Sequence, residues 1–261
     1  MADNGDPVLR VTGLNKSFGA VHVLHDVDFT VRLGEVMALV GDNGAGKSTL
    51  IKCIAGTHPF DSGRIEFDGR QVSVDGPRAA SALGIEVVYQ DLALADNLDI
   101  VQNMFLGRER RRGLVLDEPS MEQAARETLA RLSIRTVKSV RQQVASLSGG
   151  QRQTVAIAKA ALWESKVVIL DEPTAALGVA QTQQVLNLVR RLADTGHAVV
   201  LISHNLNDVF AVADRITALY LGRVAADVAR SEVTHGQIVE LITSGRSGGL
   251  GLAPRTAAEN I

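Results

Sequence analysis

The glycine-rich segment Gly41-Asp42-Asn43-Gly44-Ala45-Gly46-Lys47-Ser48-Thr49 has residue types and spacing suited to binding a phosphate chain. A glycine, four further residues, a second glycine, a lysine and a hydroxyl residue form the phosphate-loop pattern. Glycines let backbone N–H groups close around phosphate oxygens, and the helix expected to follow presents its partly positive amino end. Lys47 adds a full positive charge near the β- and γ-phosphates, and the Ser48 hydroxyl is a ligand for Mg²⁺. The segment therefore predicts a site for a nucleoside triphosphate, with contacts from Gly41, Asn43, Gly44, Ala45, Gly46, Lys47, Ser48 and Thr49.

Two adjacent acids, Asp171 and Glu172, follow the apolar run Val167 to Leu170. Asp171 is placed to hold Mg²⁺, directly or through a water molecule, as the second acidic motif of phosphate-loop enzymes does. Glu172 points in another direction and is a candidate to orient or deprotonate the attacking water. Alone, such a pair would be read as two solvated acids at a strand end. Beside a phosphate loop it predicts nucleotide hydrolysis.

His204 follows a third apolar run, Ala198 to Ile202, through Ser203. A single histidine is more often structural than catalytic. The position of His204 after a strand that ends at the same sheet edge favours a contact with the γ-phosphate.

The segment Leu147-Ser148-Gly149-Gly150-Gln151 precedes an apolar helical run from Val155 to Trp163. A serine cap followed by two glycines builds a second helix end that attracts anions. A second phosphate cradle has no obvious role beside the first one in the same chain. It has a role if two copies of the chain pack head to tail, so that Ser148, Gly149, Gly150 and Gln151 of each cover the nucleotide of the other. A flexible Ser/Gly linker is the alternative, and the helix that follows argues against it.

These groups must be positioned by a parallel sheet. The runs Val36 to Val40, Val167 to Leu170 and Ala198 to Ile202 are continuously apolar, as in strands covered on both faces. Ligands of open α/β sheets lie beyond the carboxyl ends of such strands, so the three runs predict one shared site.

Other segments predict two further parts of the fold. Val8 to Thr12, Val27 to Val31 and Arg64 to Phe67 read as short strands separated by turn residues. Between about 91 and 160 we expect a mostly helical insertion. There, Asp117 and Pro119 form a cap and first-turn pair before apolar residues at helical spacing, namely Met121, Ala124, Ala125, Leu129 and Leu132. A second amphipathic helix, marked by Val185, Leu188, Val189 and Leu192, is expected to end near Gly196. The predicted domain covers 7–243, and the glycine-rich tail 244–261 is expected to be flexible.

The composition excludes several classes of protein. The chain has 261 residues and a formal net charge of −2, which argues against electrostatic binding of nucleic acid. Cys53 is the single cysteine and is expected to be a small core residue, so no internal disulfide can form. No apolar run approaches the roughly 20 residues of a membrane-spanning helix, and Met1 to Pro7 lacks the features of a signal peptide. We therefore expect a cytoplasmic protein that reaches a membrane only through a partner.

In motif order, the sequence resembles the ATP-binding subunits of ABC transporters, from about Val8 to Ile242. The resemblance implies an α/β fold, with a phosphate-loop NTPase core, an antiparallel β subdomain and an inserted α-helical subdomain. It implies that Phe18 stacks on the adenine of ATP, and that Gln90 touches Mg²⁺ and the attacking water. It also implies integral membrane permease subunits, which dock on the helical subdomain and hold the protein on the cytoplasmic face of the membrane.

One segment departs from the family pattern. After Pro173-Thr174 the family usually reads Ser-Ala-Leu-Asp, whereas this chain reads Ala175-Ala176-Leu177-Gly178. Gly178 cannot make the polar contacts of that aspartate across the dimer, which puts coupling between the two ATP sites in question. This wording, together with Ser203 to Phe210, resembles the import branch for ribose, xylose or fructose. Many members of that branch carry two ATPase halves in one chain, whereas this sequence carries one, so the resemblance implies a homodimer. It also implies an indirect partner, a periplasmic or lipid-anchored sugar-binding protein. A non-transport ABC ATPase acting on DNA or ribosomes is the alternative, but its usual coiled-coil or zinc insertions do not appear in this sequence.

Overall fold

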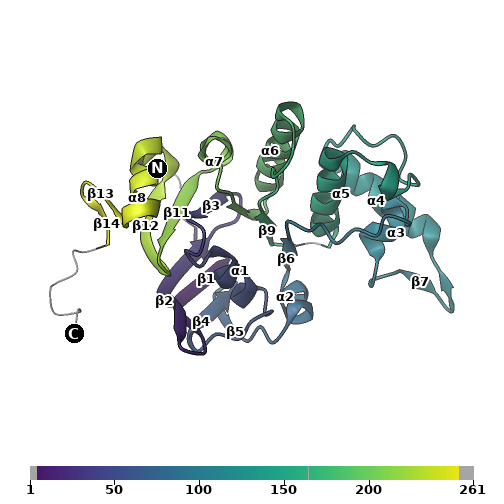
Figure 1. Ribbon diagram of the computed structural model, residues 1–261. Helices are drawn as coiled ribbons and strands as arrows, with labels where there is room; N and C mark the ends of the chain where they lie inside the picture. The colour runs from purple at the N-terminus through teal and green to yellow at the C-terminus, as the bar shows by residue number, and fades with distance from the viewer. Residues whose placement is uncertain (1–4, 164, 253–261) are drawn as a thin grey trace.

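The computed structural model describes residues 5–163 and 165–252, which form two sheets and a set of helices around them (Figure 1). No helix in this described part is long and apolar enough to cross a membrane.

Within the described residues, the larger sheet has six strands in the order β12-β11-β3-β10-β9-β6. The pairings β11–β3, β3–β10, β10–β9 and β9–β6 are all parallel, and β12 pairs with β11 in the antiparallel sense. The strands are β3 (Val36–Gly41), β6 (Ile85–Val88), β9 (Val167–Asp171), β10 (Ala198–Ile202), β11 (Arg215–Tyr220) and β12 (Arg223–Ala229). The predicted fold class is therefore confirmed in its parallel core.

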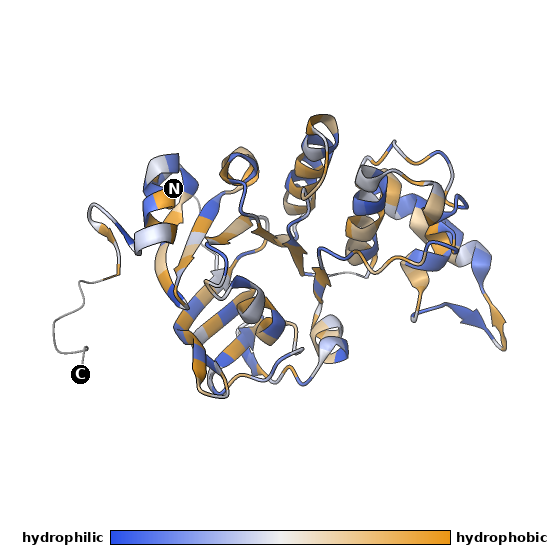
Figure 2. Ribbon diagram, in the orientation of Figure 1, coloured by the Kyte–Doolittle hydropathy of each residue, from blue (hydrophilic) through white to orange (hydrophobic). Residues whose placement is uncertain are grey.

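Both faces of the parallel sheet are covered, which explains the continuous apolar runs. All of β10 is buried, and alternate residues belong to different cores. Val199 and Leu201 pack among helices, whereas Val200 and Ile202 pack toward the second sheet. Figure 2 shows the central strands orange along their length, while β1 and β2 alternate between blue and orange. The three predicted strands are confirmed as β3, β9 and β10. They are apolar throughout because a strand covered on both faces leaves no room for polar side chains.

The second sheet is antiparallel, with the order β2-β1-β4-β5. Its strands are β1 (Leu9–Phe18), β2 (Val21–Val31), β4 (Ser62–Phe67) and β5 (Arg70–Val72). The three short strands predicted from the sequence correspond to parts of β1, β2 and β4, except that Val8 precedes β1, and β1 and β2 extend further than expected. Phe18 and Val21 close the turn between β1 and β2.

The predicted helical stretch contains α3 (Ile100–Phe105), α4 (Glu118–Arg131) and most of α5 (Gly149–Leu162). Asp117 caps α4 by accepting from the Ser120 N–H group, and a proline follows in the first turn, as predicted. The small hairpin β7 (Arg111–Arg112) and β8 (Val115–Leu116) projects from this part (Figure 1). A 3₁₀ turn spans Val144–Ser146.

The remaining helices flank the sheets. They are α1 (Lys47–Ile54), α2 (Pro77–Leu83), α6 (Val179–Asp194), α7 (Leu206–Val212) and α8 (His235–Ser244), with a 3₁₀ turn at Arg230–Glu232. In α6, Val185, Leu188, Val189 and Leu192 are buried, which confirms the predicted amphipathic helix. Cys53 is buried in α1, as expected.

The structure describes the first part of the tail that is expected to be flexible, as far as Leu252. β13 (Arg246–Ser247) and β14 (Leu250–Gly251) form a hairpin, and Leu252 packs against the core beside α8. Ser247 is buried and its hydroxyl donates to Glu240 on α8 at 2.5 Å. The rest of the predicted tail, 253–261, lies outside the described residues.

Candidate functional site

Four neighbouring parallel strands deliver the predicted residues to one edge of the larger sheet. In the strand order β3-β10-β9-β6, the residues that follow are the phosphate loop, His204, the Asp171–Glu172 pair and Gln90. Since parallel strands end at the same edge, residues distant in the sequence become neighbours. The sequence alone did not place Gln90 near a strand end; it is exposed and lies two residues after the end of β6.

The phosphate loop joins β3 to α1 with backbone angles that require glycine. Gly44 and Gly46 have φ angles of 83° and 103°, in the left-handed region that other residues rarely enter. At Gly41 a Cβ atom would lie 2.7 Å from the carbonyl oxygen of Leu219. The glycines thus shape the open N-terminus of α1, and no bulkier residue fits at Gly41.

Lys47 begins α1 and folds back over the loop. Its Nζ donates to the carbonyl oxygens of Gly41 and Asp42 at 2.6 and 3.0 Å. Burial lowers the pKa of Lys47, while the charges of Glu172, Asp42 and Asp171 act in the opposite direction. Ser48 is exposed on the first turn of α1 beside it, and Thr49 is half-buried. A cation whose hydrogen bonds go to neutral carbonyl groups is available to an anionic ligand.

Asp171 ends β9 opposite Ile202 of β10. Burial raises the pKa of the Asp171 carboxyl group, and the neighbouring charge of Glu172 adds to the rise, while Lys47 and Lys52 lower it. The negative charge of Asp171 is unfavourable because the carboxylate is partly desolvated and lies near a second carboxylate. Such a site favours a bound cation.

Glu172 leaves the strand in a strained conformation. Its φ angle is 51°, and its N–H donates to the carbonyl oxygen of Ile202 at 3.0 Å. The carboxylate lies 2.8 Å from His204 Nδ1 and also accepts from the His204 backbone N–H at 3.2 Å. The His204 side chain is 73% exposed, whereas that of Glu172 is 16% exposed. The contact between Glu172 and His204 was not predicted, because no local sequence pattern indicates which residues meet beyond the ends of neighbouring strands.

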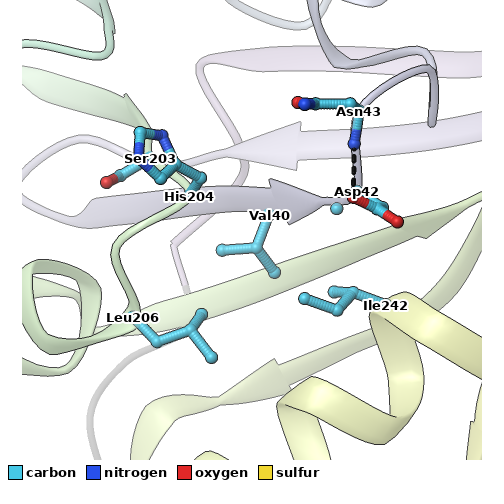
Figure 3. Close-up of a pocket in the computed structure, with 8 residues that line it drawn as sticks. Val40, Asp42, Asn43, Ser203, His204, Leu206 and Ile242 are labelled. Atoms are coloured by element: carbon cyan, nitrogen blue, oxygen red, sulfur yellow. Dashed lines mark hydrogen bonds between the residues drawn. The ribbon is translucent and has the colours of Figure 1, made fainter. Parts of the chain in front are cut away.

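A pocket of about 400 Å³ opens beside these groups (Figure 3). His204 and Asn43 lie on opposite sides of it, with Val40 between them. Leu206 and Ile242, which the sequence did not suggest, close its other wall because α7 and α8 pack near the loop. Its lining residues are Val40, Gly41, Asp42, Asn43, Ser203, His204, Leu206 and Ile242.

Phe18 is at the end of β1, and its residue surface is 44% exposed. The edge of its ring meets the His58 ring at 5.4 Å between centroids, and Lys16 Nζ lies 4.9 Å from the Phe18 centroid. Without the family resemblance this residue would be assigned to the core. An aromatic ring left in solvent at a sheet corner is instead a surface on which a planar group can stack.

Ser148 caps α5, so the predicted helix end is confirmed. Its Oγ accepts from the Gln151 N–H at 3.4 Å, and Gln151 Oε1 accepts from the Ser148 N–H at 2.9 Å. Gly149 lies against Leu177, just before α6, and Gly150 lies against Gln181 in the first turn of α6. None of the four residues Ser148 to Gln151 lines the pocket of Figure 3. The second cradle is thus separate from that pocket, with Ser148 and Gly149 exposed, Gly150 buried and Gln151 half-buried.

The described residues contain no cluster of three or more histidine, cysteine, aspartate or glutamate side chains that could hold a metal ion. The predicted magnesium ligands differ from such a cluster in being one hydroxyl, one amide and one carboxylate, from Ser48, Gln90 and Asp171. All three are oxygen donors, and Mg²⁺ is usually held by few protein oxygens together with water and phosphate.

The sequence matches known proteins over most of its length. Residues 24–175 match the family model described as ABC transporter. The chain is 45% identical to a fructose import ATP-binding protein of Rhizobium meliloti, over 92% of this chain and 95% of the relative. It is 43% identical to a xylose/arabinose import ATP-binding protein of Sulfolobus acidocaldarius, over 91% and 94%. A ribose import ATP-binding protein of Rubrobacter xylanophilus is 45% identical over 87% of this chain, which spans 46% of that relative.

Solved structures agree with the fold. A nucleotide-free ATP-binding cassette from an ABC transporter superposes with a TM-score of 0.78 at 25% identity, over 87% of this chain and 93% of that one. The cbiO1 subunit from Clostridium perfringens, part of an ABC transporter complex, gives a TM-score of 0.76 at 28% identity, over 92% and 96%.

Proposed function

This chain belongs to the ABC transporter family, and from that premise we propose that it is the ATP-hydrolysing subunit of a monosaccharide importer. The observation that carries the proposal is the meeting of the phosphate loop, Asp171, Glu172 and His204 at one sheet edge. The import ATP-binding proteins that it resembles over more than nine-tenths of their length support the transport role.

ATP binding is assigned to the phosphate loop and Phe18. The loop N–H groups and the amino end of α1 face the β- and γ-phosphates, and Lys47 exchanges its carbonyl contacts for phosphate oxygens. Phe18 offers an exposed ring to adenine, and stacking of a base on an aromatic side chain contributes about 1–3 kcal/mol in nucleic-acid complexes.

Ser48, Asp171 and Gln90 are the candidate ligands of Mg²⁺, with Asp171 acting directly or through water. The ion, when bound, neutralises charge that develops on the transferred phosphoryl group. The raised pKa of Asp171 and the absence of a bulky side chain at Gly41 fit a cation and a phosphate at this place.

Glu172 is the candidate group that orients or deprotonates the attacking water. Its carboxylate is held by the His204 backbone N–H, so it has a defined direction before substrate arrives. The His204 ring is exposed and can turn from Glu172 toward a γ-phosphate that binds beside it. General-base assistance of this kind contributes about 10²- to 10⁴-fold in rate.

A second copy of the chain is expected to supply Ser148, Gly149, Gly150 and Gln151. The amino end of α5 carries the same kind of partial positive charge as that of α1, and Ser148 and Gly149 there are exposed. ATP would then join the copies, and closure would favour one state of the permease because ATP binds the closed dimer more tightly. Permease subunits would hold the protein on the cytoplasmic face of the membrane and would receive sugar from a binding protein.

The backbone conformation at position 178 does not require glycine. Its φ is −73° and nothing lies within 4 Å of the Cβ that another residue would place there. The glycine therefore only removes a polar side chain from the start of α6, and weaker coupling between the two ATP sites is expected.

Uptake by a strain that lacks the gene tests the function. We expect loss of energy-dependent uptake of one labelled monosaccharide among ribose, xylose, arabinose, fructose and galactose. A plasmid copy of the native gene should restore that uptake, whereas a copy with Lys47→Ala should not. Unchanged uptake of all five sugars, or ATPase activity of the purified chain that only DNA or ribosomes stimulate, would contradict import.

A further inference from the structure

The turn that follows Glu172 holds two residues in an unfavourable backbone conformation. Glu172 has φ 51° and Ala176 has φ 58°, although neither is glycine. Residues other than glycine persist in the left-handed region only where surrounding contacts hold them there, and such positions gather at functional sites.

Few contacts hold the middle of this turn. Within it, the Ala175 N–H donates to the Glu172 carbonyl oxygen at 3.1 Å, and the Leu177 N–H donates to that of Thr174 at 3.3 Å. From outside the turn, Asp208 on α7 accepts a hydrogen bond from the Thr174 hydroxyl, with 2.6 Å between Oγ1 and Oδ2.

Asp208 is well placed to fix the turn. Only 6% of the residue is exposed, so its charge is largely removed from water. A hydrogen bond between a hydroxyl and a carboxylate is short and strong, and a buried carboxylate that loses its donor is costly. The Thr174–Asp208 bond is therefore a firm link and not a surface contact.

The Thr174–Asp208 bond is a second link between the segment that follows β9 and the segment that follows β10. β9 and β10 are parallel neighbours, with Asp171 opposite Ile202. Beyond their ends, Glu172 contacts His204, and two residues later along the first loop Thr174 contacts Asp208, four residues after His204. Glu172 is thus joined to His204 directly, and the turn after Glu172 is joined to Asp208 through Thr174.

We propose that Thr174 and Asp208 are positioning residues, which keep Glu172 in its left-handed conformation facing His204. The proposal rests on the role of Glu172 in the proposed function, and adds two residues that touch neither nucleotide nor water in that account. Removing their hydrogen bond relaxes Glu172 and slows the hydrolytic step without weakening ATP binding.

Steady-state ATPase kinetics of the full-length chain test this. Thr174→Val removes the hydroxyl and keeps the shape, and we expect kcat to fall by about 10- to 100-fold with KM for ATP within about twofold of wild type. Thr174→Ser is the matched control because it keeps the hydroxyl, and it should retain most of kcat. Asp208→Asn, whose amide oxygen still accepts, should lose less activity than Asp208→Ala.

Two combined variants exclude a general loss of stability. The Thr174→Val/Asp208→Ala pair should be no slower than the slower single variant, because both remove one interaction. Added to Glu172→Gln, Thr174→Val should cause little further loss. If Asp208→Ala does not fold, the comparison of Thr174→Val with Thr174→Ser still tests the positioning role.

The proposal is overturned if Thr174→Val keeps the wild-type kcat, if Thr174→Ser loses as much as Thr174→Val, or if the losses of the double variant multiply. A slow Glu172→Gln beside a normal Thr174→Val overturns this inference and leaves the proposed function intact. A normal Glu172→Gln overturns the assignment of Glu172 itself.

Discussion

Replacing Glu172 with glutamine is expected to slow ATP hydrolysis by about 10²- to 10⁴-fold while ATP still binds. Glutamine has nearly the same shape and still accepts the hydrogen bond that the His204 backbone N–H donates. It has neither the negative charge nor the basicity needed to orient or deprotonate water. The measurement is kcat from phosphate release, together with the Kd for ATP at equilibrium.

The dimer is expected to stay closed as long as its ATP is not hydrolysed. The Glu172→Gln chain should therefore also accumulate as an ATP-bound dimer in size-exclusion chromatography. Glu127→Gln is a suitable control, since Glu127 is exposed on α4 and its replacement changes net charge equally. Turnover near the wild-type rate in Glu172→Gln would remove Glu172 from its assigned role.

Replacing Lys47 with alanine is expected to weaken ATP binding by about 10- to 100-fold, the equivalent of losing a charge-assisted hydrogen bond. Hydrolysis at a fixed ATP concentration should fall at least as far. Lys47 is the cation at the amino end of α1, and within the described part of the chain its hydrogen bonds go to the carbonyl oxygens of Gly41 and Asp42. Burial lowers the pKa of Lys47, and the charges of Glu172, Asp42 and Asp171 oppose that change.

Titration calorimetry with ATP measures this change, and Lys138→Ala is the control. Lys138 is exposed, so its removal alters net charge without touching the loop. Equal ATP affinity for Lys47→Ala and Lys138→Ala would show that the glycine-rich segment does not bind the triphosphate.

Much of this site could be predicted from the sequence because its supports are continuous in the chain. The strand Val36–Val40, the glycine loop and the helix after it are adjacent, and each imposes a local pattern. The strands before Asp171 and His204 were recognisable since burial on both faces makes them wholly apolar.

Other strands escaped prediction because polar side chains interrupt them. β6 contains Glu86, which pairs with Arg108 at 2.9 Å, and β11 contains Thr217, whose hydroxyl meets Met37 Sδ at 3.3 Å. These partners lie elsewhere in the chain, so no local sequence pattern predicts them. The position of Gln90 after β6 could not be predicted for the same reason.

Contacts across the sheet edge were equally hidden. The left-handed conformation of Glu172 is dictated by its neighbours and not by its type. Its contact with His204, and the bond between Thr174 and Asp208, join loops that are separated by 32 and 34 positions. Only the fold brings such residues together.

The central claim is that ATP lies between two copies, with the phosphate loop of one facing Ser148 of the other. Cysteine crosslinking tests it, because Cys53 is buried and its pKa is raised to about 11, which leaves the native thiol unreactive. One population carries Asn43→Cys and the other Ser148→Cys, each in the Glu172→Gln background. With ATP, and only when the two populations are mixed, oxidation should yield a covalent dimer in high yield. If ATP gives no more of this dimer than buffer alone, the two cradles do not face each other and the account is contradicted.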